Sequence, residues 1–317
     1  MRLIVVGNGF DLHHGLKTSF RDYCVFLQER YPDALDCIRK FIYFNGSCRD
    51  IFDDADVFWA DVENNLSFDY GKIIESLKET IDSEFINSDD SSDGWRSVPI
   101  SIENLLYDVQ EFVPVESIDD VDEVDTRFTT SALNEWVDSI DLDEVEKDSK
   151  MSLSSDDCYV SFNYTRTLED VYRVKSSNVL HIHGGVYRGY PCNLQFGNPL
   201  QTPDSVRAIF EQKLENDFRL ERIRPALEKI QLFALKMSKD IKGNIPNLED
   251  FLKGKEITEV VIMGHSYLKV DKLYYQNVLV PNYRTKKWTI YCHTNDEEDE
   301  ARRFLKDNGI RGCTIKW

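Results

Sequence analysis

The sequence predicts an α/β protein with a Rossmann-type parallel sheet and flanking helices, plus a largely helical acidic insertion. Short apolar runs of strand length recur along the chain, and segments with helical spacing of apolar residues separate them. Several of these runs end at glycine, as parallel strands do where they pass into a helix. Between two groups of runs the composition shifts to Asp and Ser. We therefore assign residues 1–86 and 158–317 to the core, with 205–254 as its helical part, and residues 87–157 to the insertion.

The first expected strand covers residues 3–6 and leads into a glycine turn. It is wholly apolar, which is typical of a buried parallel strand, and it stops at Gly7, Asn8 and Gly9. Glycine lets the backbone approach a ligand without an obstructing Cβ, and a following helix would present N–H groups to a phosphate. Arg21, shortly after, would add positive charge. An ordinary strand-to-helix turn is the alternative interpretation of this segment.

Two familiar phosphate-binding loops fit this turn badly. The dinucleotide motif G-x-G-x-x-G begins with Gly7 and Gly9 but needs a third glycine where Leu12 stands. The mononucleotide loop G-x-x-x-x-G-K-[ST] is approached by Gly9, Gly15 and Lys17, but its spacing is wrong. The sequence therefore disfavours both a dehydrogenase and a P-loop NTPase.

Helices are expected between this turn and the end of the insertion. Thr18 or Ser19 can cap a helix whose apolar residues, starting with Phe20 and Tyr23, follow helical spacing. Further helices are expected over residues 34–44, 57–66 and 70–86, and within the insertion over residues 102–112 and 128–140.

The sheet pattern resumes after the insertion. Strands are expected over residues 158–162, 179–183, 259–263 and 288–292, with an edge strand over residues 312–316. The helices between them are a short one around Leu168, a long stretch over residues 205–241 that Pro225 interrupts, one that Asp271 caps, and one over residues 297–306. Strand alternation places His181 and His183 on one face, so we expect the two imidazoles to project together.

Four of these strands end in polar or glycine-containing segments. Because the carboxyl ends of parallel strands meet at one edge of a sheet, these segments could line one cleft. A hydrogen-bonded structural residue is the alternative at each position taken alone. The residues that we expect at a bound ligand are Gly7, Asn8, Gly9, Asp11, Arg21, Asn163, His183, Gly184, Gly264, His265 and Ser266.

Composition excludes several classes of protein. The chain has 317 residues, 41% of them hydrophobic, and a formal net charge of −19, which disfavours binding to nucleic acid or to an anionic membrane. No apolar run approaches the roughly 18 residues of a membrane span, and no signal peptide is evident, so we expect a cytoplasmic protein. Seven cysteines without any C-x-x-C pair argue against a disulfide framework or a zinc ribbon.

Two other kinds of chemistry are weakly supported. His181 and His183 could begin a metal site, but no convincing third ligand stands nearby, so we expect no metal. Gly264, His265 and Ser266 resemble a G-x-S-x-G nucleophile elbow without its final glycine, which leaves a serine hydrolase as a minor option.

Four ordered motifs together resemble the bacterial abortive-infection family AbiH, which is associated with phage defence. They are GNGFDL at 7–12, SFNYTRTLE at 161–169, HIHG at 181–184, and GHS at 264–266 followed by Asp271. That family looks distantly like the sirtuin fold, an NAD-binding Rossmann-type domain. This chain lacks the sirtuin aspartate two residues after Asn163, where Thr165 stands, and lacks the zinc module. Sirtuin-like defence proteins without that module act as NAD hydrolases, and this is the activity that the resemblance implies.

The resulting hypothesis is an enzyme that cleaves the nicotinamide–ribose bond of NAD+ in a phage-infected cell. Such cleavage develops oxocarbenium charge on the ribose, so it needs a fixed polar shell and a base. In this hypothesis Asn163 orients the ribose or the attacking water, and His183 is the general base. The glycine turn would face the pyrophosphate. A nucleotide-sensing module that acts through a partner without turnover is the alternative; the phage trigger and the oligomeric state, including a homo-oligomer, stay open.

Overall fold

The structure, a computed structural model, describes most of the expected core and part of the expected insertion. The described residues are 1–32, 35, 69–75, 132–187, 190–192, 194–195, 197–217, 238–267 and 270–317, together with isolated positions between 220 and 235. The expected helices over residues 34–44 (apart from position 35), 57–66 and 102–112 lie outside the described residues.

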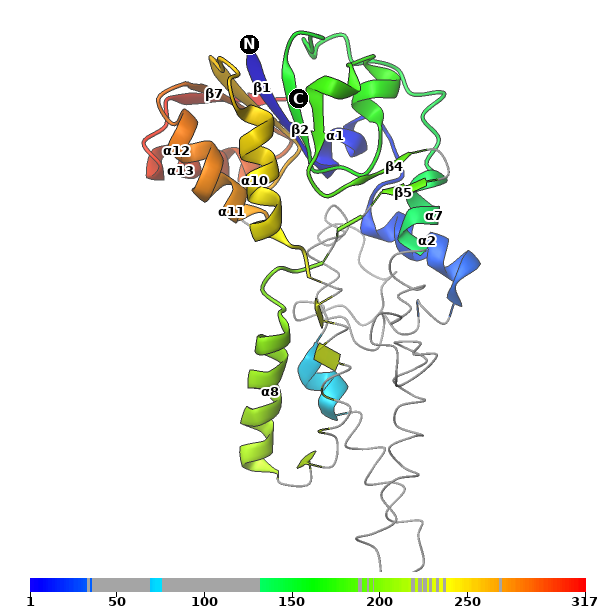
Figure 1. Ribbon diagram of the computed structural model, residues 1–317. Helices are drawn as coiled ribbons and strands as arrows, with labels where there is room; N and C mark the ends of the chain where they lie inside the picture. Colours follow the sequence, from blue (N-terminus) through cyan, green and yellow to red (C-terminus); the bar gives the residue numbers. More distant parts are fainter. Residues whose placement is uncertain are drawn as a thin grey trace, which may run out of the picture.

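The centre of the molecule is a parallel sheet in the strand order β3-β2-β1-β6-β7-β8 (Figure 1). Its strands are β1 (Arg2–Val6), β2 (Cys158–Ser161), β3 (Val179–His181), β6 (Glu259–Met263), β7 (Lys287–Cys292) and β8 (Gly312–Lys316). If the strands of this sheet alone are numbered along the chain, their order is 3-2-1-4-5-6, which is the Rossmann order. Strands β2 and β3 extend the sheet on one side of β1, whereas β6, β7 and β8 extend it on the other side, so the strand order reverses between β1 and β6. The predicted α/β fold class is confirmed, and β8 is an edge strand as expected.

Apolar alternation on the strands builds a core on both faces of the sheet. Leu3 and Val5 belong to one cluster of buried side chains, and Ile4 and Val6 belong to the other. The first cluster includes side chains of α10 (Ile241–Leu252), α11 (Lys272–Tyr274), the π-helix η6 (Tyr275–Leu279) and α13 (Asn295–Asp307), whereas α12 (Val280–Tyr283) contributes partly buried side chains. The second face packs against α1 (Asn8–His13) and the π-helix η3 (Thr167–Val171). Burial of nearly all of β1, β2 and β6 explains why these strands are almost continuous apolar runs.

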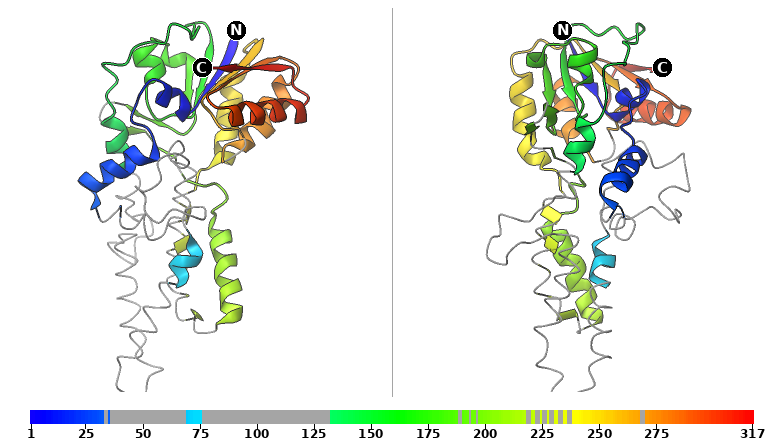
Figure 2. Two further views of the ribbon diagram at one scale, coloured as in Figure 1. Left: turned by 180° about the vertical axis from the view of Figure 1, so that it is seen from behind. Right: turned by 90° about the vertical axis from the view of Figure 1, so that its right-hand side faces the viewer.

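Two helices pack side by side below the sheet in Figure 1. They are α2 (Phe20–Arg30) and α7 (Ala132–Asp138), and the rings of Tyr23 and Trp136 lie 5.0 Å apart between them (Figures 1 and 2). Ser19 caps α2 by accepting a hydrogen bond from the backbone N–H of Asp22, as the sequence predicted. Because α7 lies inside the segment assigned to the insertion, the described end of that segment is attached to the core.

The longest described helix, α8 (Pro203–Asn216), projects away from the sheet (Figures 1 and 2). Thr202 caps it by accepting a hydrogen bond from Ser205 N. A helical turn over residues 70–75 lies beside it, and Lys213 forms an ion pair with Glu75 between the two. Helix α8 covers the beginning of the helical stretch expected over residues 205–241.

Some local expectations were wrong. The strand expected over residues 179–183 ends at His181, and the short 3-10 helix η4 (Ser176–Asn178) precedes it. A two-stranded hairpin, β4 (Gly185–Tyr187) with β5 (Tyr190–Cys192), follows and was not foreseen. Asp271 stands at the N-cap of α11, but its side chain makes no capping hydrogen bond.

Among the described residues, no helix is both long and apolar enough to cross a membrane.

Candidate functional site

A cavity of about 450 Å³ lies at the carboxyl ends of the strands, at the reversal point between β1 and β6. Its polar wall includes residues that the sequence had singled out: Asn8, Gly9, Asp11, Asn163, Gly264, His265 and Ser266. Apolar side chains of α7 form part of another wall. Open α/β sheets bind ligands at this position, and the volume falls in the range of small-molecule sites, about 300–1,000 Å³.

The two glycine turns pack directly on each other. A Cβ atom on Gly9 would lie 2.7 Å from Gly264 Cα, and one on Gly264 would lie 2.2 Å from Phe10 N. Gly264 also has a φ of 60°, in the left-handed region that favours glycine. These glycines are therefore required for contact between the two turns.

The turn does not offer all of its amides to an anion. Gly9 N donates to Gly264 O at 2.9 Å, and Phe10 N donates to Gly7 O at 2.8 Å. For these two amides the expectation of free N–H groups facing a phosphate was wrong, because protein carbonyls already accept their hydrogens. Gly7 itself does not line the cavity, whereas Asn8 and Gly9 do.

Asn163 is fixed at the polar wall of the cavity by hydrogen bonds on several sides. Its side-chain Nδ2 donates to Gly7 O at 3.0 Å, and its backbone N donates to Ser161 Oγ at 3.2 Å. The residue is 7% exposed. Because β1 and β2 are adjacent in the sheet, the hydrogen bond to Gly7 holds the segment after β2 against the glycine turn after β1.

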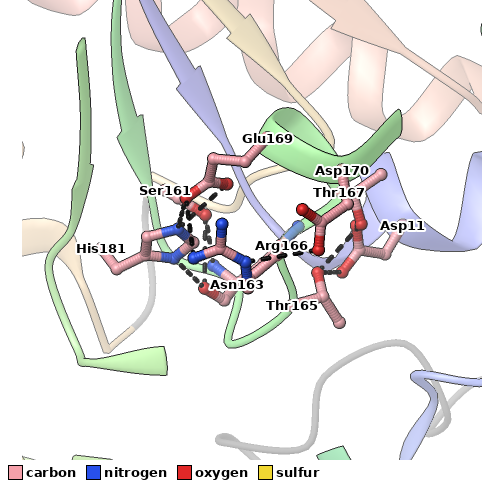
Figure 3. Close-up of polar contacts among 9 residues, drawn as sticks. All are labelled: Asp11, Ser161, Asn163, Thr165, Arg166, Thr167, Glu169, Asp170 and His181. Atoms are coloured by element: carbon pink, nitrogen blue, oxygen red, sulfur yellow. Dashed lines mark hydrogen bonds and ion pairs between the residues drawn. The ribbon is translucent and has the colours of Figure 1, made fainter. Parts of the chain in front are cut away.

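Asp11 is a buried carboxylate at the same wall. Its Oδ2 accepts a hydrogen bond from Thr165 Oγ1 at 2.5 Å, and its Oδ1 accepts one from Thr167 Oγ1 at 2.8 Å (Figure 3). The side-chain amide of Asn163 adds a further hydrogen bond. Burial raises the pKa of Asp11 to about 6, although these hydrogen bonds oppose the shift.

His181 faces away from His183, contrary to the expectation that the two imidazoles project together. His181 Nε2 lies 3.1 Å from Glu169 Oε1, and its Nδ1 lies 3.0 Å from Asn163 O (Figure 3). His183 instead reaches Tyr274 and Asp271. The strand ends at His181 and the chain turns at Ile182, so strand alternation no longer applies at His183.

Asp271 is a second buried carboxylate of the cavity, and three basic side chains surround it. Its Oδ1 lies 3.3 Å from Lys239 Nζ and 3.6 Å from His183 Nε2, and its Oδ2 lies 3.2 Å from His265 Nε2. Burial by itself would raise the pKa of Asp271, but the positive charge of Lys239, with His183 and His265, lowers it well below its usual range. Asp271 is therefore ionised at neutral pH.

His265 lines the cavity with both ring nitrogens occupied. Nε2 contacts Asp271, Nδ1 lies 2.7 Å from Tyr275 Oη, and the ring stacks on Phe162 with 3.8 Å between centroids. Its neighbour Ser266 also lines the cavity, but no hydrogen bond joins Ser266 to a histidine within the described part of the chain. The arrangement gives no support to a serine hydrolase, which needs a base on its nucleophile.

Four of the expected site residues do not line the cavity. One is Gly7; of the others, Arg21 is exposed on α2, Gly184 lies in the turn after β3, and the side chain of His183 is fully buried against Asp271. Sequence reasoning missed other polar residues at or beside the site, namely Thr18, Thr167, Glu169 and Lys239. The alternation of polar residues in the motif at 161–169 was a usable signal for Thr167 and Glu169; nothing in the sequence singled out Lys239.

The described residues contain no group of three His, Cys, Asp or Glu side chains that could hold a metal ion. Absence of a metal stays a prediction for the chain as a whole.

Comparison with known proteins identifies the family. No curated protein and no solved structure matches the chain, so the likeness to sirtuins stays a prediction. A family model described as "Bacteriophage abortive infection AbiH" matches residues 3–292, a span that includes every residue of the polar wall named above. The chain therefore belongs to the AbiH family of bacteriophage abortive infection proteins, and its role is in bacterial defence against phage.

Proposed function

We propose that this AbiH-family chain binds NAD+ in the cavity at the β1–β6 reversal point and hydrolyses its nicotinamide–ribose bond. The observation that carries the proposal is the meeting of two buried carboxylates, Asp11 and Asp271, with the Asn163 amide in one cavity of a Rossmann-order sheet. Loss of NAD+ would stop metabolism in an infected cell, which suits an abortive-infection protein.

The charges of this cavity suit a cationic transition state. When the bond from ribose C1′ to the nicotinamide nitrogen breaks, the electron pair leaves with nicotinamide and positive charge develops on the ribose. Negative groups held in a water-poor site stabilise such charge strongly, because they need no reorganisation as it develops. Asp271 is ionised and held in place by Lys239 and His265, so it meets this requirement.

A polar ligand would also satisfy a hydroxyl at the cavity wall. Thr18 Oγ1 is buried and has no hydrogen-bond partner among the described residues, although Thr18 lines the cavity. The Asn8 side chain holds Thr18 in place by donating to its carbonyl oxygen at 2.9 Å. Buried polar groups are rarely left unpaired, and in this proposal a ribose or phosphate oxygen of NAD+ is the hydrogen-bond partner of the Thr18 hydroxyl.

His183 and Lys239 support the site from behind in this proposal. Both side chains are fully buried and contact Asp271, and neither lines the cavity. The charge of Lys239 keeps Asp271 ionised, and the contacts of both side chains fix its position. Direct proton transfer between His183 and a ligand would require the imidazole to move, because it does not line the cavity.

A nucleotide-sensing module is the second candidate function. It is favoured by one observation: His265, the partly buried histidine at the cavity wall, has both ring nitrogens bonded to protein groups. Such a site could bind a nucleotide and pass the event to a partner without turnover.

The deciding experiment is incubation of the purified chain with NAD+, followed by chromatography for nicotinamide and ADP-ribose. We expect both products in equal amounts. Calorimetric titration of NAD+ runs in parallel. Heat of binding without nicotinamide release would favour the sensing module, and neither binding nor release would refute both candidates. Glu75→Gln is a suitable control variant, because Glu75 pairs with Lys213 of α8 and neither residue lines this cavity.

A further inference from the structure

Asp11 and Asp271 are two buried carboxylates of one cavity with opposite surroundings. Asp271 contacts a lysine and two histidines. Asp11 accepts its hydrogen bonds from neutral groups, the hydroxyls of Thr165 and Thr167 and the amide of Asn163, and no described Lys, Arg or His forms an ion pair with it. When the environments of two acids differ in this way, their roles in acid–base chemistry differ too.

We propose that Asp11 is the general base that removes a proton from the attacking water during hydrolysis of NAD+. This inference rests on the proposed function and adds a residue role to it. Asp11 lines the cavity, whereas His183 does not, and Asp11 lies beside Asn163, which can orient the water. The two threonine hydroxyls hold the carboxylate in one orientation without neutralising its charge.

The proton-transfer step balances with water as the co-reactant. The bond from C1′ to the nicotinamide nitrogen breaks, and its electron pair leaves with neutral nicotinamide. A water oxygen forms the new bond to C1′, and one proton of that water passes to the Asp11 carboxylate. Asp11 then releases the proton to solvent, so the products are nicotinamide, ADP-ribose and one proton.

Burial and the polar groups around Asp11 shift its pKa in opposite directions. His181 acts on it from the end of β3 and lowers its pKa, but His181 is itself paired with Glu169. Arg166, in the segment between β2 and η3, faces Glu169 and Asp170. Burial outweighs these influences and raises the pKa of Asp11 to about 6. The base form therefore predominates at pH 7 and is lost below pH 6.

The first test uses the unmodified chain. Hydrolysis by water should fall about tenfold per pH unit below about pH 6, because the base is then protonated. Azide, an anionic nucleophile with no proton to remove, should yield ADP-ribosyl azide and nicotinamide with no such acid limb. An acid limb that is the same for water and azide would overturn the inference.

The second test replaces the carboxylate. Asp11→Asn should reduce hydrolysis by about 10²- to 10⁴-fold, the usual contribution of a general base, while NAD+ binding measured by calorimetry changes by less than about tenfold. Azide should restore nicotinamide release in this variant, and Asp11→Glu should keep an acid limb at a shifted pH. Glu75→Gln should match the parent throughout, because neither Glu75 nor its partner Lys213 lines the cavity.

Failure of the inference can be told apart from failure of the proposed function. If the parent cleaves NAD+ and Asp11→Asn cleaves it equally, with the same pH profile, the inference fails and the function stands. If the parent releases no nicotinamide, the function fails and the inference falls with it. If Asp11→Asn does not fold, the comparison of water with azide in the parent decides.

Discussion

The side-chain amide of Asn163 donates a hydrogen bond to the carbonyl oxygen of Gly7, 3.0 Å away. This bond joins the loop after β2 to the turn after β1, two segments that are far apart in the sequence and adjacent in the sheet. Asn163 thus serves the fold and faces the cavity at once. Substitutions at this position should affect both stability and ligand chemistry.

Asn163→Ala should destabilise the protein by about 1–3 kcal/mol, because the buried carbonyl oxygen of Gly7 loses its partner. It should also remove most of the NAD+ cleavage if the proposed function holds. Urea unfolding gives the first quantity, and nicotinamide release per folded molecule gives the second. Asn178→Ala is the matched control, since Asn178 donates a comparable bond to Ser155 O at an exposed position. Equal stability of the two variants would contradict the structural role of Asn163.

Gly264→Ala should be among the most destabilising single substitutions in the chain. A Cβ there would meet Phe10 N at 2.2 Å, and the residue already has a φ of 60°. Gly254→Ala is a close control, because Gly254 has a φ of 75° but no atom within 4 Å of an added Cβ. We expect a loss of about 1–3 kcal/mol at Gly254 from backbone strain alone and more than about 4 kcal/mol at Gly264. Thermal unfolding of the two variants side by side measures the difference.

The sequence was sufficient to predict the sheet but only part of the site. Buried parallel strands are continuous apolar runs that end at glycine, so β1, β2, β6 and β7 could be placed within a residue or two. The convergence of their polar ends followed from topology, and Asn163, Asp11 and His265 do line one cavity.

The rest depended on information that local patterns do not carry. Period-2 alternation was extended two residues past the end of β3, which misplaced His183. Lys239 lies 32 positions before Asp271 in sequence, and only tertiary packing brings the two together. Thr165 is a further example, because it stands where the sirtuin pattern has an aspartate. The carboxylate that contacts Thr165 comes instead from Asp11 on α1, and no local motif at 161–169 could indicate that contact.

Lys239→Met should destabilise the chain by about 3–5 kcal/mol, because it leaves the buried Asp271 carboxylate without its principal partner. Asp271 has a lowered pKa in the folded state, so its ion pairs contribute stability above the unfolded pKa of about 3.9. That stability is lost as pH falls through the folded pKa. In Lys239→Met the folded pKa should rise, and acid unfolding should therefore occur at a higher pH than in the parent.

The double variant Lys239→Met, Asp271→Asn is the control for this ion pair. Removing both charges should recover part of the stability at pH 7 and abolish the difference in acid unfolding. If Lys239→Met alone unfolds at the same pH as the parent, the two side chains do not interact as the structure indicates. Circular dichroism against pH for the three chains is the measurement.

His183→Gln and His183→Ala together separate a supporting histidine from a catalytic one. His183 Nε2 lies 3.2 Å from Tyr274 Oη and 3.6 Å from Asp271 Oδ1, and the side chain is fully buried. A glutamine amide can replace the Nε2 contact to Asp271, whereas alanine leaves a void in the core. We expect His183→Ala to lose about 2 kcal/mol or more of stability together with much of the cleavage, and His183→Gln to keep most of both.

A general base at His183 would give a different pattern, because glutamine cannot accept and release a proton. His183→Gln would then fold like the parent and be as inactive as His183→Ala. Nicotinamide release at pH 7, normalised to the folded fraction from near-UV circular dichroism, distinguishes these outcomes.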